Sequence, residues 1–370
     1  MRVGFFSPLP PARTGVADYS AALLAALRRH GEVAVNDAAA DIALYHIGNN
    51  LLHREIYERA IARPGVAVLH DAALNHFFLG TLDERSYAEE FVYNYGEWDR
   101  GLAQDLWKNR ARSAADPRYF EYPMLKRLAT ASRAIIVHNP AAARAVCRHH
   151  PQARVIEIPH LFVPPELPDP VEVLRLRSEL GLGPRSLLAG VFGHLRESKR
   201  LCSILRAMER VWAAGAPSGA DVKLLVQGAF ASSDLERAIT PLIAGNSHIL
   251  RAPALPEREF WRWAMAADVC LNLRFPAAAE SSGIAIRMMG IGKTVIFTSG
   301  EELARFPENS FLAVETGPAE DAMLADYLVW LARDRTALVE IGRRAAAHIR
   351  KEHAVEKVAR QYGEALEGAR

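Results

Sequence analysis

Cysteine is scarce in this sequence of 370 residues, which has three, at Cys147, Cys202 and Cys270. No two of them form a Cys-x-x-Cys pair, which excludes a structural zinc site of that type. Isolated cysteines are typical of chains that fold in a reducing compartment. The sequence therefore predicts a cytoplasmic protein that needs no disulfide bonds.

Long apolar runs are also missing. No stretch stays apolar over the length that a membrane-spanning helix requires. The first residues, MRVGFFSPLPPARTG, lack the long apolar core of a signal peptide and instead predict a first β-strand followed by a loop. Any membrane contact is therefore expected to be peripheral, at the inner face of the membrane.

Neither sign of charge dominates the chain. The 45 Lys and Arg residues and the 43 Asp and Glu residues leave a net charge of +2, and the basic residues form no long run. The net charge alone decides nothing about nucleic acid, but without a basic tract we expect no nucleic-acid partner. None of the 13 histidines lies in a His-Glu-x-x-His motif and no acidic cluster stands out, so we expect no bound metal ion.

What the sequence has instead is an alternation of short apolar runs with amphipathic segments. This alternation predicts an α/β fold in which helices cover both faces of a parallel sheet. Ligands of such sheets gather at the carboxyl ends of the strands. The predicted strands are Arg2–Phe6, Asp41–Ile47, Val66–Leu69, Ala134–Val137, Arg154–Ile158, Leu187–Phe192, Val222–Val226, His248–Leu250, Val269–Leu273 and Thr294–Phe297.

A proline-rich stretch divides the pattern into two halves. His160–Pro170 (HLFVPPELPDP) has four prolines in eleven residues, which predicts a linker. We therefore expect one Rossmann-like domain over residues 1–160 and a second over residues 171–350. A polar and aromatic stretch over about 80–130 interrupts the first domain and predicts a helical insertion, in which most aromatic side chains pack on their own domain.

The segment Pro276–Ile296, PAAAESSGIAIRMMGIGKTVI, predicts a loop, a helix, a glycine stop and a strand. Gly283 would let the backbone approach a ligand, and the helix start offers free N–H groups and the positive end of a dipole to an anion. Glu280, just before this start, could accept hydrogen bonds from hydroxyls. An acid beside an anion site suits a sugar attached to a diphosphate, although an ordinary strand–helix corner with a solvated glutamate also fits the pattern.

A second polar segment, Gly193–Arg200 (GHLRESKR), follows a predicted strand and opens a predicted helix, with Ser198 as the expected N-cap. Arg196 and Lys199 lie in or beside this turn, where both could reach one phosphate. A guanidinium and an ammonium at the carboxyl end of a strand would neutralise a leaving diphosphate. The alternative is a solvated, positively charged loop.

Two features of the first half complete the candidate site. Ser7–Gly15 joins the first strand to the first helix, and its small residues could close over a ligand held by the other half, or form a rigid surface turn. His70 and Asp71 follow the strand Val66–Leu69 and would face the cleft, where the aspartate could orient the histidine or bind acceptor hydroxyls. A histidine that only caps the next helix is the alternative. Other histidine candidates are His46, His76 and His138.

Taken in this order, the three segments resemble the family-4 glycosyltransferases of the GT-B fold, and the resemblance covers nearly the whole chain. The N-terminal loop resembles the family's glycine-containing loop, which implies that Thr14 and Gly15 lie near the diphosphate and the acceptor. The turn after the sixth predicted strand resembles the family's G-R-x-x-x-x-K phosphate turn, with Lys199 at the lysine position. His194 stands at the usual arginine position, and Arg196 is expected to supply the guanidinium.

The segment Glu280–Ile296 resembles the family's E-x7-E segment, usually EGFGLPxLEAMAxGxPVI. Glu280 matches the first acid, which contacts the hydroxyls of the donor sugar in the family. Gly283 and Ile284 match the backbone that approaches the sugar and the phosphate.

The second acid of that segment, which holds the nucleotide ribose in the family, is absent. Met288 stands at its position, preceded by Arg287. The run from Glu280 through Ser281 and Ser282 to Arg287 follows the pattern E-[ST]-S-G-x-x-x-R, which is similar to a bacterial subgroup of the family.

The resemblance implies a GT-B fold, with two Rossmann-like parallel-sheet domains that face each other across a cleft and a helix over residues 351–370 that returns to the N-terminal domain. It implies a metal-independent, retaining glycosyltransferase of the hexosyl type, without a cofactor, in bacterial glycan or glycoconjugate synthesis. The donor would be a UDP- or GDP-sugar, and the acceptor a hydroxyl of a sugar, of a lipid-linked molecule or of another compound. Catalysis is assigned to His70, Arg196, Lys199 and Glu280, and substrate binding to Thr14, Gly15, Asp71, His194, Ser281, Ser282, Gly283, Ile284 and Arg287.

Two other functions stay open at this point. A nucleotide-sugar 2-epimerase would share the fold and alter the sugar without an acceptor. A catalytically inactive GT-B module would bind a glycan or a partner, which Met288 and His194 favour, whereas Glu280, Arg196 and Lys199 count against it. The sequence defines no oligomeric state.

Overall fold

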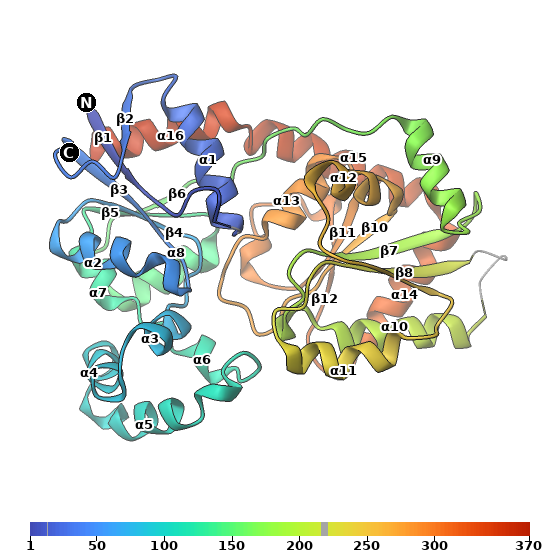
Figure 1. The fold of residues 1–370 in the computed structure, drawn as a ribbon, viewed down its shortest axis with the longest axis horizontal. Helices are drawn as coiled ribbons and strands as arrows, with labels where there is room; N and C mark the ends of the chain where they lie inside the picture. The colour runs from blue at the N-terminus through green and yellow to red at the C-terminus, as the bar shows by residue number, and fades with distance from the viewer. Residues whose placement is uncertain (13, 216–220) are drawn as a thin grey trace.

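The chain forms two α/β domains that lie side by side in Figure 1. The computed structural model describes residues 1–12, 14–215 and 221–370. Each domain is built on a six-stranded sheet, and all the paired strands run parallel.

The first sheet has the strand order β2-β1-β3-β4-β5-β6. The runs IALYHI, VAVL and AIIV, which form its centre, are buried at every position because helices cover both faces of a parallel sheet. Its strands are β1 (Arg2–Phe6), β2 (Glu32–Val35), β3 (Ile42–Ile47), β4 (Val66–Leu69), β5 (Ala134–Val137) and β6 (Val155–Glu157).

The second sheet has the order β12-β11-β10-β7-β8-β9. Its central strand β7, LLAGVF, is buried at all six positions and pairs with β8 along its whole length. The strands are β7 (Leu187–Phe192), β8 (Val222–Gln227), β9 (Ile249–Ala252), β10 (Val269–Asn272), β11 (Thr294–Thr298) and β12 (Leu312–Val314).

Every strand that the apolar runs predicted is present, with small shifts at its ends. Two strands were missed, β2 and β12, and both lie at an edge of their sheet. Edge strands are partly exposed, so their sequences, EVAV and LAV, carry only short apolar stretches.

Helices connect the strands and cover both sheets. The segment 158–169 between the two domains has no helix or strand, and the first helix of the second domain begins at Pro170. The helices are α1 (Gly15–Leu27), α2 (Arg54–Ala62), α3 (Asn75–Thr81), α4 (Glu84–Tyr95), α5 (Arg100–Lys108), α6 (Arg118–Glu121), α7 (Lys126–Ala131), α8 (Pro140–His149), α9 (Pro170–Glu179), α10 (Leu201–Ala213), α11 (Ser233–Ile243), α12 (Glu257–Ala266), α13 (Gly283–Gly290), α14 (Glu320–Arg333), α15 (Arg335–Glu352) and α16 (Val355–Gly368).

The last helix, α16, lies against α1 of the first domain, where Figure 1 draws it in red beside the blue helix. The hydroxyls of Tyr19 on α1 and Tyr362 on α16 share a buried hydrogen bond of 2.8 Å. Just before α16, Nδ1 of His353 bonds to the carbonyl oxygen of His160 at 2.6 Å. The end of the chain is therefore fastened both to the first domain and to the start of the linker.

The insertion between β4 and β5 consists of α3 to α7 and contributes aromatic side chains to the core of its own domain. Tyr87 and Phe91 are completely buried, as the sequence predicted for the aromatic residues of this stretch, whereas Trp98 is fully exposed. The hydroxyl of Tyr119 donates to the carbonyl oxygen of Leu106 at 2.6 Å and joins α6 to α5.

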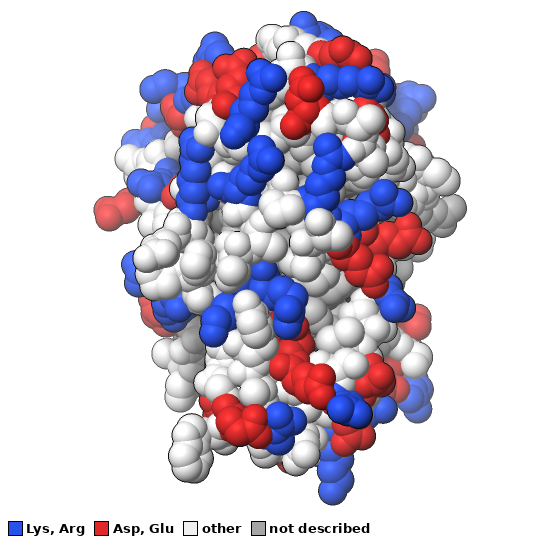
Figure 2. Space-filling view, turned by 90° about the vertical axis from the view of Figure 1, so that its left-hand side faces the viewer, with Lys and Arg blue, Asp and Glu red and all other residues white. Residues whose placement is uncertain are grey.

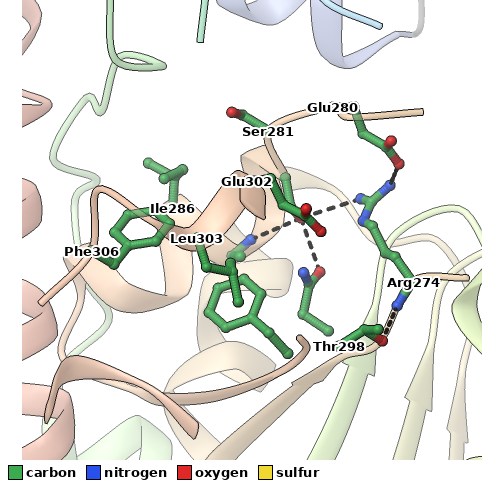
Figure 3. Close-up of a pocket in the computed structure, with 12 residues that line it drawn as sticks. Arg274, Glu280, Ser281, Ile286, Thr298, Glu302, Leu303 and Phe306 are labelled. Atoms are coloured by element: carbon green, nitrogen blue, oxygen red, sulfur yellow. Dashed lines mark hydrogen bonds and ion pairs between the residues drawn. The ribbon is translucent and has the colours of Figure 1, made fainter. Parts of the chain in front are cut away.

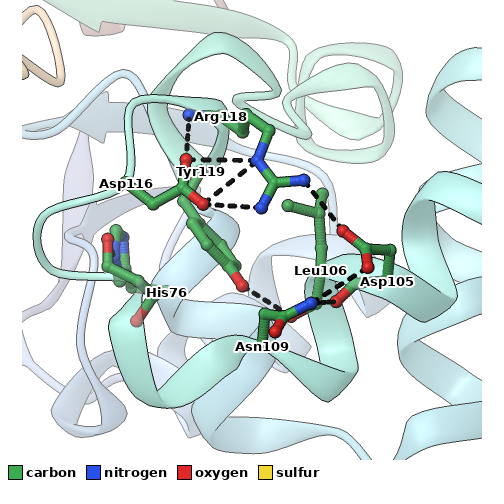
Figure 4. A network of polar contacts seen from close by, with 8 residues as sticks. His76, Asp105, Leu106, Asn109, Asp116, Arg118 and Tyr119 are labelled. Atoms are coloured by element: carbon green, nitrogen blue, oxygen red, sulfur yellow. Dashed lines mark hydrogen bonds and ion pairs between the residues drawn. The ribbon is translucent and has the colours of Figure 1, made fainter.

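An ion-pair network reinforces the same part of the insertion, as Figure 4 shows. The guanidinium of Arg118 lies between the carboxylates of Asp105, at 2.8 Å, and Asp116, at 2.7 Å. His76 on α3 bonds through Nε2 to the carbonyl oxygen of Ser113 at 3.0 Å. The candidate residue His76 is therefore engaged in the structure of the insertion.

Helix α10 has the apolar stripe that the sequence predicted, but it does not begin where the sequence predicted. The helix begins at Leu201, after Arg200, whose φ of 59° lies in the left-handed region. Ser198 lies in a short 3₁₀ turn and is not the N-cap, so that prediction was wrong. The stripe residues Leu201, Ile204, Leu205, Met208 and Val211 are all buried.

Candidate active site

Lys199 lies in the turn after β7 and is buried against the end of that strand. Its Nζ donates a hydrogen bond to the carbonyl oxygen of Phe192, and the residue is only 8% exposed. Burial, and then repulsion by the guanidinium of Arg274, lower the pKa of Lys199 to about 7. An anion bound at this strand end would favour the charged form of the amine.

Arg196 and His194 belong to the same turn, and both are exposed. Burial of part of the ring, and then the charges of Arg196 and Lys199, lower the pKa of His194. The three side chains therefore act on one another electrostatically, and the turn presents positive charge at the end of β7.

Arg274, which sequence reasoning missed, is the centre of the polar contacts around Glu280. It follows β10, and Figure 3 shows it beside Glu280 on the loop that precedes α13. Its Nη1 pairs with Oε1 of Glu280, and its Nη2 donates to Oγ of Ser282 at 3.2 Å. Its backbone N–H donates to Oγ1 of Thr298 at 2.9 Å. The only signal in the sequence is an arginine directly after a buried strand.

Glu280 uses both carboxylate oxygens within its own domain. Oε1 accepts from Arg274, and Oε2 accepts from the backbone N–H of Ala278 at 2.8 Å. Behind them lies a cavity of about 30 Å³, which Glu302, Leu303 and Phe306 help to line (Figure 3). Burial raises the pKa of Glu302, and the negative charge of Glu280 adds to this shift. The positive charge of Arg274 therefore offsets the negative charges of Glu280 and Glu302.

The start of α13 lies at the boundary between the domains. The hydroxyl of Ser282 caps the helix by accepting from the N–H of Ala285 at 3.3 Å and donates to Oδ1 of Asn272 at 2.9 Å. Ser282 is thus held inside its own domain by its hydrogen bonds. A Cβ at Gly283 would lie 3.6 Å from Nε2 of His160, in the segment between the two domains.

Hydrogen bonds across the boundary hold the loop before α13 against the first domain. The amide of Asn139 donates to the carbonyl oxygen of Ala279 at 2.8 Å and to Oγ of Ser281 at 3.1 Å. The N–H of Ala72 donates to the carbonyl oxygen of Ala278 at 2.8 Å. Ser281 is thus a contact between the domains in this structure.

On the first domain, histidines gather where β3, β4 and β5 end. Nδ1 of His46 and Nε2 of His70 are 3.0 Å apart, and the rings of His70 and His138 have centroids 5.2 Å apart. Tyr19 lies among them, with its ring 5.0 Å from that of His70 and 4.8 Å from that of His160. The other histidine candidates His46 and His138 therefore join His70 in one cluster, and His160 extends it.

Burial keeps this cluster uncharged at neutral pH. It is the main cause that moves the pKa of His46 and of His70 well below the ordinary value. The same cause lowers the pKa of His138 to about 4 and that of His160 to about 3. Within the described part of the chain, the buried Nε2 atoms of His46 and His138 have no hydrogen-bond partner.

Asp71 lies between the histidines and the second domain. The N–H of Asn49 donates to its Oδ2 at 3.0 Å. Burial, and then the negative charge of Glu280, raise the pKa of Asp71, while Arg196 and Arg274 act in the opposite direction. The carboxyl group is therefore within electrostatic reach of the candidate residues on the other domain.

Arg287 and Met288 lie one turn into α13 and differ in environment. Met288 is completely buried in the core of the second domain, so the position of the missing acid does not face the boundary. The guanidinium of Arg287 lies over the rings of Trp261, at 4.3 Å, and Phe260, at 4.9 Å, and its Nη2 bonds to Oε1 of Glu257 at 3.0 Å.

The N-terminal loop contributes a helix cap. Oγ1 of Thr14 accepts from the N–H of Ala17 at 3.1 Å and caps α1, which begins at Gly15. Apart from its chain neighbours, no described residue has an atom within 4 Å of the Cβ that another residue would place at Gly15. Ile284 at the start of α13 lies beside Gly193, whose φ of 83° shapes the turn after β7.

The described residues, 1–12, 14–215 and 221–370, contain no group of three or more His, Cys, Asp and Glu side chains placed to hold a metal ion. In the same part of the chain, no helix combines the length and the apolar character needed to cross a membrane.

The candidate site thus has two unlike sides. The cationic side consists of Arg196, Lys199 and Arg274 at the carboxyl ends of β7 and β10. The histidine side consists of His46, His70, His138 and His160 with Tyr19. Between them lie the start of α13, Glu280 and Asp71. Positive groups beside a helix start can bind an anion, and neutral buried groups can accept or donate hydrogen bonds to an uncharged molecule.

No family model matches the sequence, and neither does any curated protein. Solved structures do match along essentially the whole chain. HepE of Anabaena in complex with UDP-glucose has a TM-score of 0.64 at 14% identity, with both chains covered completely. Sucrose-phosphate synthase from Thermosynechococcus elongatus has a TM-score of 0.67 at 13% identity, covering 100% of this chain and 98% of that one.

A third match is WaaG, a glycosyltransferase involved in lipopolysaccharide biosynthesis, with a TM-score of 0.65 at 13% identity and coverage of 99% and 100%. At such identities the likeness shows the fold. It agrees with the two parallel sheets and confirms the predicted fold class. The chain has the GT-B fold, with two Rossmann-like domains that face each other across a cleft.

Proposed function

We propose that this chain is a retaining glycosyltransferase, similar to a bacterial subgroup of family 4, that transfers a sugar from a UDP- or GDP-sugar to a hydroxyl. The observation that carries the proposal is the pair Arg196 and Lys199 in the turn after β7, on the same boundary as the start of α13 and Glu280. Two cations and free helix N–H groups suit a diphosphate.

The donor lies on the cationic side. Its diphosphate contacts Lys199, Arg196 and the first N–H groups of α13, and its sugar lies against Glu280, which Arg274 orients. HepE was solved with UDP-glucose, and this supports a nucleotide sugar here as well. Lys199 gives up its bond to the carbonyl oxygen of Phe192 when the phosphate arrives.

The acceptor hydroxyl lies on the histidine side, near His70 and Asp71. The new bond forms between the acceptor oxygen and the anomeric carbon, while the bond from that carbon to the diphosphate breaks. The departing phosphate takes the acceptor proton on the same face of the sugar, so configuration is retained and no protein nucleophile is needed. Lys199 and Arg196 stabilise the negative charge that grows on the leaving group. No metal ion takes part.

The acceptor is a sugar, a lipid-linked molecule or another hydroxyl compound in bacterial glycan synthesis. We place the reaction in the cytoplasm, at the inner face of the membrane. The three cysteines are free, which suits a reducing compartment. Figure 2 shows Lys and Arg side chains crossing the upper half of the face that the first domain turns to the viewer. Such a row is attracted to anionic lipid.

A panel of nucleotide sugars tests the proposal, because a ligand that binds only the folded protein raises its melting temperature. We expect UDP- or GDP-sugars to raise it, and product to form only when an acceptor is added. An altered nucleotide sugar without any acceptor would instead identify a 2-epimerase. If neither UDP nor GDP binds in calorimetry, the chain is an inactive module.

Variants of the site test the assigned roles. Lys199→Ala and Arg196→Ala should each lower turnover about a hundredfold to a thousandfold while changing donor affinity less, because their charge acts mainly in the transition state. Glu280→Gln should change the preference among sugars more than the preference among nucleotides. Turnover at the wild-type level in all three variants would contradict the assignment.

A further inference from the structure

A nucleotide bound with its diphosphate at the start of α13 must place its ribose further along the second domain, and this inference rests on that proposed function. A carboxylate is a common partner of ribose hydroxyls, since it accepts two hydrogen bonds from neighbouring hydroxyls. Met288, where the resemblance places that acid, is completely buried in the core. The ribose therefore needs another partner.

The acids nearest to the cationic side are already engaged. Both oxygens of Glu280 accept bonds, from Arg274 and from the N–H of Ala278. Glu197 accepts from the hydroxyl of Ser232 at 2.7 Å through Oε1 and lies in the turn assigned to the diphosphate. In the proposed function Glu280 is assigned to the donor sugar, so the ribose needs an acid further along the domain.

Glu257 differs from them. Its Oε1 accepts from Nη2 of Arg287 at 3.0 Å and from Nε1 of Trp261 at 3.4 Å. Among the described residues none donates to its Oε2, and 75% of its side chain is exposed. One oxygen therefore holds the carboxylate in place while the other remains available to a ligand.

The supporting residues fix where this carboxylate lies. Arg287 is held over the rings of Trp261 and Phe260. It follows Gly283 by four residues, which corresponds to about 6 Å along a helix axis. Glu257 itself begins α12, directly after the loop that leaves the carboxyl end of β9. The carboxylate is thus bonded to a side chain that lies one helical turn into α13, and its own helix begins at the ligand edge of the sheet.

A residue of the other domain shows that this place belongs to the boundary. Asp18 on α1 interacts electrostatically with both Arg287 and Glu257. Burial raises the pKa of Asp18, and the charge of Glu257 adds to the shift while Arg287 opposes it. The pair Arg287 and Glu257 therefore faces the first domain, where a nucleotide between the domains would pass.

We propose that Glu257, held by Arg287, binds the 2′- and 3′-hydroxyls of the donor's ribose and replaces the acid that is absent at position 288. Arg287 acts as a positioning residue, because its guanidinium is occupied by the glutamate and the two rings. The pair makes this enzyme selective for ribonucleotides over 2′-deoxyribonucleotides.

Calorimetric titration with UDP, GDP, 2′-deoxy-UDP and 2′-deoxy-GDP tests the inference on the full chain. The wild-type protein should bind the ribose form of its nucleotide about tenfold more tightly than the deoxy form, the effect of one hydrogen bond to a charged group. Glu257→Ala should bind both forms with affinities within about threefold of each other. Glu259→Ala removes an acid of the same helix that pairs with Arg262 and not with Arg287, so it should keep the wild-type ratio and serves as the matched control.

The outcomes separate this inference from the proposed function. Equal binding of ribose and deoxy forms by the wild-type protein overturns the inference, as does a wild-type ratio in Glu257→Ala, and both leave the nucleotide-sugar function standing. Failure of the wild-type protein to bind either nucleotide overturns both. Arg287→Lys gives a second readout: it should reduce the ratio although the carboxylate is still present, because lysine lacks the planar fork that holds Glu257.

Discussion

The two sides of the cleft are built on the same scaffold and have opposite electrostatic character. Both lie at the carboxyl ends of parallel strands in a six-stranded sheet. The second domain places Arg196, Lys199 and Arg274 there, whereas the first places histidines that burial keeps uncharged at neutral pH. The residues that follow each strand, and not the topology, therefore give the two sides their opposite character, and the proposed assignment of the anion to one side and the hydroxyl compound to the other rests on this difference.

Both sides also hold buried nitrogens without a hydrogen-bond partner. On the cationic side, Nη1 and Nη2 of Arg274 bond to Glu280 and Ser282, but its buried Nε has no partner among the described residues. On the histidine side, the buried Nε2 atoms of His46 and His138 find no partner in residues 1–12, 14–215 and 221–370. Unpartnered buried nitrogens destabilise a protein.

The largest effect on stability should come from a substitution that places a charge in the core of the second domain. Met288→Glu places a carboxylate in a completely buried position without a partner. We expect it to lower the free energy of unfolding by about 4 kcal/mol or more, or to prevent folding. Met288→Leu keeps the volume and should cost less than about 1.5 kcal/mol. Urea unfolding of both variants measures this, and a stable Met288→Glu protein would place residue 288 at the surface.

Lowering the pH should reduce the stability of the folded protein through the buried histidines of the histidine side. The folded-state pKa of His138, about 4, is lower than the ordinary 6.5, so between these values the unfolded chain takes up a proton and the folded one does not. Stability is therefore lost as the pH falls from 6.5 towards 4, by about 2 kcal/mol for this residue at pH 5. His138→Asn should lose about that much less than the wild type between pH 7 and pH 5. Identical losses, measured by urea unfolding, would contradict the assignment.

The cationic side should respond to pH in another way. With a pKa of about 7, the amine of Lys199 is mostly uncharged at pH 8. A nucleoside diphosphate bound beside this amine favours the ammonium form. The protein should therefore take up at most about 0.9 proton for each nucleotide that it binds at that pH. Calorimetry in buffers of different ionisation enthalpy measures this uptake. Lys199→Arg, which is always charged, should bind without it, and uptake in that variant would point to another group.

A smaller effect on stability is expected from removing the hydrogen bonds that Asn139 makes across the boundary between the domains. Asn139→Asp keeps the cap of α8 but cannot donate to the carbonyl oxygen of Ala279 or to Ser281. The free energy of unfolding should fall by about 1 kcal/mol. Asn139→Ala also removes the cap and should lose roughly 1 kcal/mol more. Equal stability of Asn139→Asp and the wild type would show that these contacts do not hold the loop before α13.

The strands of both domains could be predicted because apolar runs in a doubly covered parallel sheet need no tertiary information. The short edge strands β2 and β12 were missed, whereas the edge strands β6 and β9, which are also partly exposed, were predicted. The return of α16 to the first domain came from the family resemblance alone. Its contact with α1 depends on Tyr19 and Tyr362, which lie far apart in the sequence.

The candidate site was only partly predictable, because several of its residues are brought together only by tertiary contacts. Arg196 and Lys199 lie in one short turn, so the sequence brings them together by itself. Arg274 and Glu280 meet only because the loop between them folds back, and no periodicity encodes that. The histidines come from separate strand ends, and their convergence follows from the order β3-β4-β5-β6, which the sequence did not give.

The central claim is that the cationic side, and not the histidine side, holds the nucleotide. Calorimetric titration of UDP and GDP into two double variants tests it most directly: Arg196→Ala with Lys199→Ala, and His70→Ala with Asp71→Asn. The first should lose about a hundredfold in affinity for the nucleotide that the wild-type protein binds, since two charge-assisted contacts are removed. The second should stay within about threefold of the wild type. Loss of affinity in the second variant and wild-type affinity in the first would contradict the account.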